Sequence, residues 1–192
     1  MRKSRQETVE TRKRIIHAAS TEFRRDGIGA TGLADLMSAA GLTHGGFYRH
    51  FESKDQLVAE MCSEAFAEKA KELVAVINGR RGRKALQATA SEYLSTSHRD
   101  DPGTGCPLAS LGSEIARCNK STRSKATKGI TNMVETIAGQ LEEDRPSHAK
   151  RRALVAISTM VGALTLSRIV DDSALSKLIL REAEKHIAES SN

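Results

Sequence analysis

The sequence has 192 residues and a net charge of +6, from 30 Lys and Arg against 24 Asp and Glu. Hydrophobic residues make up 39% of it and recur periodically, which excludes a disordered chain, and no apolar run reaches the roughly 18 residues of a membrane span. Aromatic residues are only 3%, without any Trp, whereas a strand-rich fold draws heavily on aromatics and closely spaced turns. The composition therefore predicts a helical protein without a membrane span.

The first 25 residues hold eight basic and three acidic side chains, which favours a polyanionic partner. No apolar stretch follows the basic start, so a secretory signal is not expected. The three cysteines (Cys62, Cys106 and Cys118) form neither a zinc-binding pattern nor a disulfide framework, and a reducing cytoplasm is the expected location. We expect no metal and no cofactor.

Glycines and prolines divide the chain into nine expected helices, each with apolar residues at helical spacing. Gly27 is expected to end the first helix, and Thr31, Thr43 and Ser53 to cap the next three. A loop is expected over 98–105. The helices are expected over residues 7–26, 32–40, 43–51, 53–78, 83–97, 107–119, 121–142, 147–170 and 173–190. The fold class is therefore all-α.

The second and third helices are short and are joined by a tight turn at Gly41, with a long helix ahead of them. This order is the pattern of a helix-turn-helix unit. The third helix, THGGFYRHF, begins with small residues that can enter a major groove and continues with side chains that can bind phosphates.

The chain resembles the TetR family of transcriptional regulators. The resemblance rests on TRKRIIHAASTEFRRDG and on ATGLADLMSAAGLTHGGFYRHFESKDQL, and it covers about residues 8–58. Gly32 departs from the family pattern, which more often has a β-branched residue there. The resemblance implies a DNA-binding domain over 1–52 and an effector-binding and dimerisation domain over 53–192, with helix 53–78 connecting them. It also implies a repressor that binds a palindromic operator as a dimer and is released by a small molecule.

The resemblance places the DNA contacts on the short helices. His44 and Gly45 are expected to face bases, with Gly46 allowing close backbone approach unless it is simply tolerated. Phe47 and Phe51 are expected to pack into the core against Ile16, Ala19 and Phe23. Phosphate contacts are expected from Thr31, Thr43, Tyr48, His50 and Lys54. Arg2, Lys3 and Arg5 form either an arm over the DNA or a solvated tail.

The family dimerises through its last two helices, which here are about 147–170 and 173–190. Small residues in ALVAISTMVGALTLSRIV permit close helix contact, although a buried helix of a monomer has the same composition.

The resemblance implies that the fifth to seventh helices enclose a cavity for a small-molecule effector. Phe66 and Tyr93 are the only aromatic residues in this half, so a small or aliphatic effector is favoured. Cys106 precedes a helix, whose dipole lowers a thiol pKa, and is a candidate redox or electrophile sensor. The alternative is a buried capping thiol. Cys118 lies about 18 Å further along the same helix, so the two cannot form a disulfide within it, which leaves a reversible modification or a bond between subunits open.

The sequence also bears on two other function classes. An enzyme is disfavoured because the histidines are scattered and no nucleophile or nucleotide motif occurs; His98, Asp100 and Asp101 read as a solvated surface cluster, so no catalytic residue is expected. A DNA-binding protein without sequence preference remains open, and salt and sequence dependence of binding would distinguish it.

Overall fold

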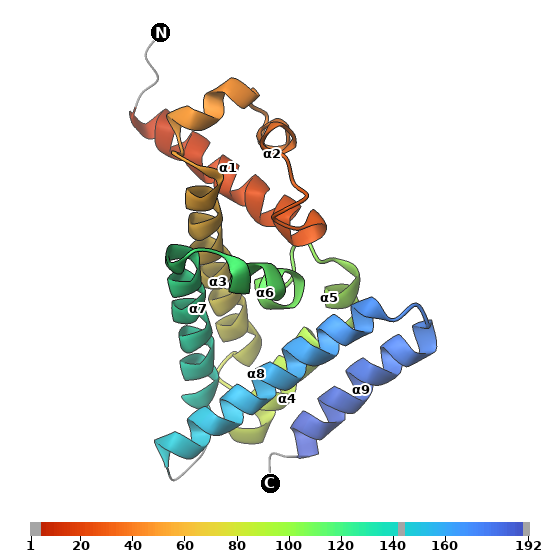
Figure 1. Ribbon diagram of the computed structural model, residues 1–192. Helices are drawn as coiled ribbons and strands as arrows, with labels where there is room; N and C mark the ends of the chain where they lie inside the picture. The colour runs from red at the N-terminus through yellow and green to blue at the C-terminus, as the bar shows by residue number, and fades with distance from the viewer. Residues whose placement is uncertain (1–4, 142–144, 190–192) are drawn as a thin grey trace.

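A computed structural model describes residues 5–141 and 145–189 of the chain. Within these ranges every regular element is helical, with nine α-helices and one 3-10 helix, which confirms the all-α prediction. Three helices form a head at the top of Figure 1, and the remaining helices form a larger body below it. Arg2 and Lys3 lie outside the described residues, whereas Arg5 begins the first helix.

The head consists of α1 (Arg5–Asp26), α2 (Leu33–Ala39) and η1 (His44–Arg49). As expected, Gly27 ends α1: it adopts a φ of +92°, and its N–H donates to the Phe23 carbonyl at 2.8 Å. Gly41 makes the next turn with a φ of +70°. The predicted cap of α2 is corrected, because Gly32 occupies the N-cap position and the Thr31 hydroxyl instead donates to the Gly27 carbonyl at 2.7 Å.

The third predicted helix, 43–51, is shorter and more tightly wound than expected. It is a 3-10 helix of six residues, and Thr43 stands at its N-cap without a side-chain capping hydrogen bond. Adjacent glycines at 45 and 46 each disfavour an α-helix by roughly 1 kcal/mol relative to Ala, which accounts for the lost α-helical winding.

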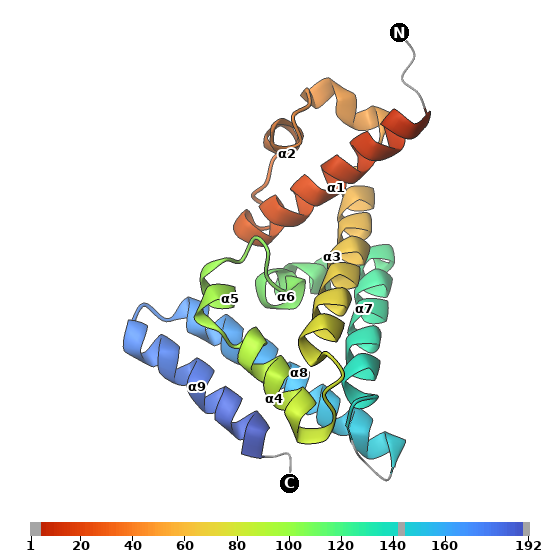
Figure 2. The same ribbon diagram turned by 180° about the vertical axis from the view of Figure 1, so that it is seen from behind.

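One long helix, α3 (Lys54–Ile77), runs from the head into the body, where α7 (Lys120–Ala138) lies beside it in Figures 1 and 2. Ser53 caps α3 as predicted, by accepting from the Gln56 N–H at 3.1 Å. Midway along the pair, Gly129 of α7 faces Phe66 of α3, and a Cβ there would lie 2.2 Å from the Phe66 ring. Only glycine fits this contact.

The expected helix 83–97 is two helices, α4 (Gly82–Tyr93) and α5 (Thr96–Asp100). Ser95 separates them, because its side chain caps α5 by accepting from the His98 N–H at 3.2 Å. The expected loop 98–105 consequently begins inside α5. After it, α6 (Pro107–Arg117) begins with Pro107 in its first turn, as predicted.

The chain closes with α8 (Pro146–Ile169) and α9 (Ser173–Glu189), which lie side by side as the blue pair in Figure 1. Within the described part of the chain, α8 is the one helix that is long and apolar enough to cross a membrane by length and composition. Its buried residues pack into the protein core instead: Ala153, Ile157, Met160 and Leu164.

Candidate functional site

The head is built around buried phenylalanine rings. Phe23, Phe47 and Phe51 are buried, and the rings of Phe47 and Phe51 stack with their centres 5.6 Å apart. From α1, the Arg12 guanidinium lies 4.0 Å from the centre of the Phe51 ring and donates to the main-chain carbonyl of His50. The predicted core role of Phe47 and Phe51 is therefore confirmed, and these contacts hold η1 against α1.

The opposite side of η1 is open to solvent and polar. Tyr48 is 66% exposed, and its ring edge rests on the Phe47 ring at a centroid distance of 5.3 Å. Thr43, His44 and Gly45 are exposed on the same short helix, and His50 is half-buried at its end. Six of the eight predicted DNA contacts thus lie on or directly beside one element: Thr43, His44, Gly45, Gly46, Tyr48 and His50.

No packing inside the chain requires the two glycines of η1. A Cβ at Gly45 would meet nothing within 4 Å, and one at Gly46 would make an ordinary contact of 3.5 Å with Met37. Neither glycine adopts a positive φ. The small residues therefore leave the outer surface of η1 clear rather than relieve an internal clash.

Thr31 and Lys54, the other two predicted contacts, lie elsewhere in the head. The Lys54 ammonium donates to the carbonyls of Ile28 and Thr31, at 2.6 and 2.7 Å, so it fastens the loop between α1 and α2 to the start of α3. Thr31 itself is buried. Sequence reasoning did not single out Arg49, which is exposed beside Tyr48 and adds a cation to the open side of η1.

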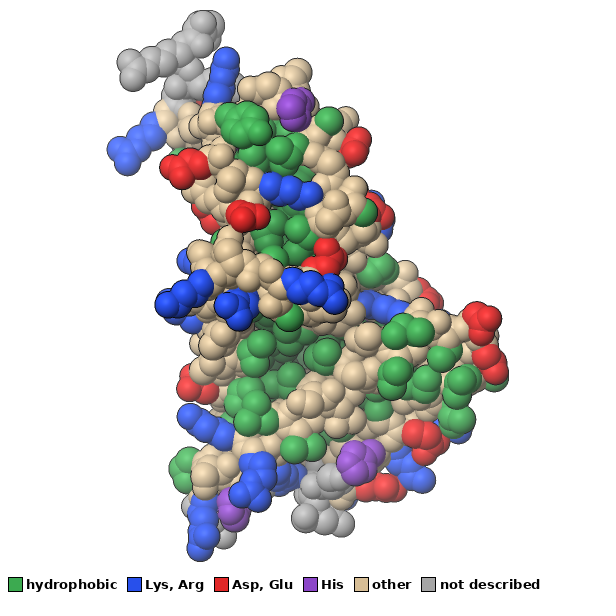
Figure 3. Space-filling model, in the orientation of Figure 1, with side chains coloured by type: hydrophobic (Ala, Val, Ile, Leu, Met, Phe, Trp, Pro, Cys, Tyr) green, Lys and Arg blue, Asp and Glu red, His purple; other side chains and the backbone are tan. Residues whose placement is uncertain are grey.

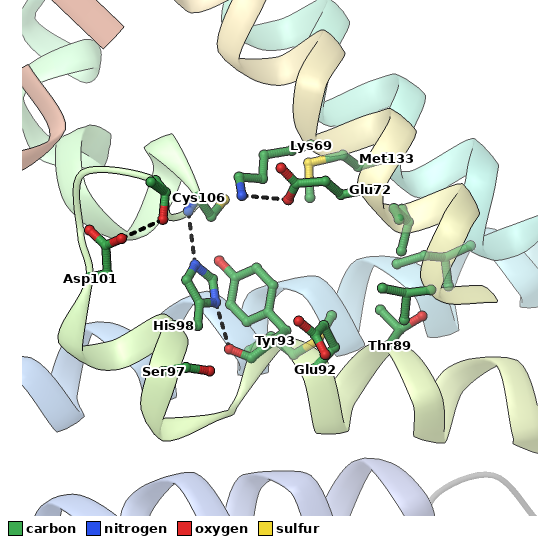
Figure 4. A pocket seen from close by; sticks show the side chains of 15 residues that line it. Lys69, Glu72, Thr89, Glu92, Tyr93, Ser97, His98, Asp101, Cys106 and Met133 are labelled. Carbon is green, nitrogen blue, oxygen red and sulfur yellow. Dashed lines mark hydrogen bonds and ion pairs between the residues drawn. The ribbon is translucent and has the colours of Figure 1, made fainter. Parts of the chain in front are cut away.

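A cavity of about 400 Å³ opens in the body beneath the head (Figure 4). Helices α3, α4, α7 and α8 supply its walls, and the segment from α5 to the start of α6 closes one end. Its lining is polar toward α5 and aliphatic toward α7. The lining residues are Lys69, Glu72, Leu73, Val76, Thr89, Glu92, Tyr93, Ser97, His98, Asp101, Thr104, Cys106, Met133, Ile137 and Met160.

Two of the three predicted effector residues line this cavity. Tyr93 reaches it from the end of α4, and Cys106, which is fully buried, reaches it from the N-cap of α6. Phe66 is a buried core residue packed on Gly129, and it is absent from the lining. Cys118 stands at the opposite end of α6 from Cys106, as the sequence predicted.

His98 organises the polar end of the cavity. Its Nδ1 lies 2.7 Å from the Tyr93 carbonyl, which can only accept, and its Nε2 accepts from the Cys106 N–H at 2.9 Å. The ring is therefore neutral, with its proton on Nδ1. Burial lowers the His98 pKa, in keeping with that state. The sequence predicted a solvated cluster for His98 because no local pattern indicates that α5 directs this side chain into the cavity.

The Tyr93 hydroxyl is buried and has no hydrogen-bond partner among the described residues. Burial raises the Tyr93 pKa well above its ordinary value, and the neighbouring Cys106 thiol adds to the rise, so the phenol stays protonated. A thiol is only a weak hydrogen-bonding group, so the contact with Cys106 leaves the phenol without a strong partner. The Tyr93 ring meets the His98 ring edge-on at 4.7 Å, which fixes where the hydroxyl points.

Two arginines hold the segment from α5 to the start of α6, one from α1 and one from α8. Arg24, near the end of α1, donates to the carbonyls of Gly105 and Thr104 at 2.8 and 3.4 Å. Arg168 of α8 donates to the His98 carbonyl at 2.6 Å. Burial lowers the pKa of both guanidinium groups. The head is thus bonded directly to residues beside the cavity wall.

The outer faces of α8 and α9 are apolar. Figure 3 shows hydrophobic side chains gathered over this pair, to the right of the waist of the molecule. The exposed residues on these helices are Leu154, Val155, Leu166, Ile169, Leu175 and Leu178, of which Ile169 is 71% exposed.

Among residues 5–141 and 145–189, no group of His, Cys, Asp and Glu could hold a metal ion.

Comparison with known proteins identifies both halves of the chain. Residues 15–61 match the family model of bacterial regulatory proteins of the tetR family. Residues 83–185, more than half of the chain, match the C-terminal domain of LmrA/YxaF-like transcriptional regulators.

Individual relatives agree. The transcriptional regulator TtgR of Pseudomonas putida is 43% identical over 58 residues, which span 30% of this chain and only 28% of TtgR. The repressor NemR of Escherichia coli is 23% identical over 141 residues, covering 72% of this chain and 71% of NemR.

Solved structures share the fold. The crystal structure of reduced Escherichia coli NemR superposes with a TM-score of 0.78 at 22% identity, over 93% of this chain and 95% of NemR. A TetR regulator from Chloroflexus aurantiacus has a TM-score of 0.78 at 29% identity, over 96% of this chain and 95% of that one. These relatives are regulators and not enzymes, so the enzymatic alternative is rejected. The chain belongs to the TetR family of bacterial transcriptional regulators.

Proposed function

We propose that the protein is a cytoplasmic repressor that binds a palindromic operator as a homodimer and leaves it when a small molecule fills the cavity beneath the head. The observation that carries this proposal is the open polar side of η1, held outward by the buried rings of Phe23, Phe47 and Phe51. The relative NemR is itself named a transcriptional repressor, which supports repression over activation.

The proposed DNA contacts divide by chemistry. His44 donates to a purine acceptor in the major groove, while Gly45 and Gly46 let the backbone come close to the bases. Tyr48 and His50 bind phosphates, with Thr43 at the start of η1. Lys54 retains one N–H beyond its two bonds to carbonyls for a nearby phosphate, and Thr31 acts mainly by holding its loop.

The proposed division of labour places DNA binding in residues 1–52 and effector binding and dimerisation in 53–192. A single helix-turn-helix unit reads too few base pairs for useful specificity, so a two-fold dimer on a palindrome is expected. The apolar outer faces of α8 and α9 supply the dimer contact, through about 147–170 and 173–190. Two such helices from each protomer make a four-helix bundle.

The proposed release works through differential affinity of the effector for two conformations. Arg24 provides a physical connection, since it belongs to α1 of the head and binds the carbonyls of Thr104 and Gly105 next to the cavity. A filled cavity displaces this segment and with it α1. Cys106 lines the same cavity, so covalent modification of its thiol would displace the same segment and α1.

The test begins with selection of binding sequences from random double-stranded DNA, followed by affinity measurements on the selected sequence and on a scrambled one. We expect an enriched palindrome. Tyr48→Phe should weaken binding to both sequences alike, whereas His44→Ala should alter preference at one base pair, by about 1–3 kcal/mol.

The control is Tyr93→Phe, which removes the other tyrosine hydroxyl, inside the cavity, and should leave DNA affinity unchanged without a ligand. Equal affinity for all sequences would instead favour an architectural DNA-binding protein. Normal binding by both Tyr48→Phe and His44→Ala would refute the assignment of η1.

A further inference from the structure

The polar side chains around the cavity are almost all satisfied within the chain. The Thr89 hydroxyl donates to the Ala85 carbonyl at 2.9 Å, and the Thr104 hydroxyl donates to Asp101 at 2.8 Å. Both ring nitrogens of His98 are occupied. The Tyr93 hydroxyl is the exception among the described lining residues, since it is buried without a hydrogen-bond partner. Buried polar groups are normally paired, so this donor points to a group that the cavity receives.

The lining side chains at the buried end of the cavity are uncharged. Tyr93 is a neutral phenol and His98 is a neutral imidazole, and the Cys106 side chain lies next to both (Figure 4). The lysine of the lining, Lys69, is paired with Glu72 at 2.5 Å. Arg168 stands outside the lining, where it donates to the His98 carbonyl at 2.6 Å. Burying a charge without an opposite partner is strongly unfavourable, so an ionised group has no place beside Tyr93.

The carboxylates of the lining lie at its solvent side. The Glu72 side chain is 58% exposed, and Glu92 and Asp101 are also exposed. A carboxylate ligand would be repelled by Glu72 on its approach to Lys69. An ammonium ligand would find its opposite charges only at this outer edge, away from the buried end.

The rest of the wall is aliphatic. Leu73 and Val76 of α3 face Met133 and Ile137 of α7, with Met160 of α8 beside them, and none of these has an aromatic ring. Unbranched Met side chains adapt to flexible aliphatic groups. At about 400 Å³ the cavity is at the small end of the roughly 300–1,000 Å³ range of ligand pockets.

We propose that the effector is an uncharged molecule with an aliphatic body and one hydrogen-bond acceptor, such as a ketone or ester carbonyl, whose oxygen accepts from the Tyr93 hydroxyl. This ligand class rests on the proposed effector function of the cavity. Binding of such a molecule gives the Tyr93 hydroxyl a hydrogen-bond acceptor and adds no charge beside Tyr93 and His98. Its aliphatic body covers the aliphatic wall of the cavity. The Tyr93 carbonyl also binds the His98 ring, and the His98 ring accepts from the Cys106 N–H. The bound acceptor is therefore linked through Tyr93 and His98 to the segment whose Gly105 carbonyl Arg24 binds.

The experiment compares three molecules of equal chain length that differ in the head group: 2-nonanone, nonanoate and nonylamine. Binding to the full-length protein without DNA is measured by titration calorimetry. We expect 2-nonanone to bind at least tenfold more tightly than either charged compound. Tyr93→Phe, which keeps the ring and loses only the hydroxyl, should weaken 2-nonanone about tenfold.

Tyr48→Phe is the matched control, because it removes the chain's other tyrosine hydroxyl on the exposed side of η1 and should leave the affinity for 2-nonanone unchanged. Unfolding midpoints of both variants check that the folds are equal. Failure of 2-nonanone to bind, tighter binding of a charged compound, or unchanged affinity in Tyr93→Phe would each overturn the proposal.

Release from DNA is measured separately with the selected operator. If 2-nonanone binds with the expected dependence on Tyr93 but leaves the operator complex intact, the ligand class is supported and the proposed effector-driven release is wrong. Binding together with dissociation of the complex supports both.

Discussion

Gly129 shows how strongly a single position without a side chain controls the packing of the body. It faces the Phe66 ring at the contact between α3 and α7, where a Cβ would lie 2.2 Å from a ring carbon. The sequence suggested a ligand role for Phe66 because aromatic residues are rare in this half. Its place in the core could not be predicted, since the facing glycine is 63 residues away and nothing local links the two.

We expect Gly129→Ala to destabilise the protein by about 1–3 kcal/mol, because the added methyl group forces α3 and α7 apart. Chemical denaturation of the purified protein measures the change. The control is Gly112→Ala on α6, where a Cβ meets nothing within 4 Å and Ala is the better helix former. Equal stability of Gly129→Ala and the unmodified protein would contradict the contact.

His98 makes stability depend on pH. Its folded pKa lies below the ordinary 6.5 mainly because of burial, with smaller contributions from Lys69 and Arg168; the bond to the Tyr93 carbonyl and the charge of Glu72 oppose the shift without cancelling it. Below pH 6.5 the unfolded chain therefore binds more protons than the folded one. The stability that the neutral His98 ring contributes is therefore fully present above pH 6.5. It is lost as the pH falls toward the lower pKa of His98 in the folded protein.

Denaturation at pH 7.5 and 5.5 tests this dependence. We expect the unmodified protein to lose more stability between the two pH values than His98→Gln does, because the variant lacks the titrating ring. His17→Gln, which removes an exposed histidine of α1, should retain the full difference. The same loss in His98→Gln as in the unmodified protein would show that another group is responsible.

At the scale of elements, the segment between α5 and α6 is where the sequence was least informative. The starts of α3 and α6 were predicted correctly, because the Ser53 cap and Pro107 in the first helical turn depend only on residues close in sequence. The break after Tyr93 was missed because Leu94 and Ser95 contain no glycine or proline. The bonds from Arg24 and Arg168 to this segment span 81 and 70 residues, and only the folded chain brings them together.

Arg24→Lys keeps the charge but cannot reproduce the fork of bonds to Ser20, Thr104 and Gly105. We expect amide hydrogen exchange over residues 101–106 to accelerate about tenfold, equivalent to roughly 1.4 kcal/mol of local stability. Arg25→Lys is the control: Arg25 is exposed, pairs with Glu22 on its own helix and has no hydrogen bond to the 101–106 carbonyls among the described residues, and Lys keeps its charge near Asp101. Unchanged exchange in Arg24→Lys would mean that α1 does not hold this segment.

At the scale of the whole molecule, the helix order and the aromatic core of the head were predictable from periodicity and from the residues 8–58 that carry the family resemblance. The cavity was not, because its lining comes from five separate helices and their connections. The composition did anticipate one property of it: few aromatic residues were available, and the wall opposite Tyr93 is aliphatic. Composition also suggested the proposed dimer face, because small and apolar residues recur along α8.

We expect Ile169→Lys to convert the proposed dimer to a monomer and to abolish operator binding, because it places a charge at the most exposed apolar residue on the outer faces of α8 and α9, at the C-terminal end of α8. Light scattering coupled to size-exclusion chromatography gives the mass of each species. Val74→Lys is the control, because Val74 is 59% exposed but lies on α3. A dimeric Ile169→Lys variant would place the interface elsewhere.

The unbroken course of α3 has a mechanical consequence. Its 24 residues make a rigid rod about 36 Å long, with one end under the head and the other beside the cavity. A tilt of about 5° at the cavity end swings the head end by about 3 Å, and in the proposed two-fold dimer the spacing between the two heads would change by twice that distance. Successive turns of one DNA groove are about 34 Å apart and allow no such stretch, so a small angular strain in the body is amplified into a misfit with the double helix.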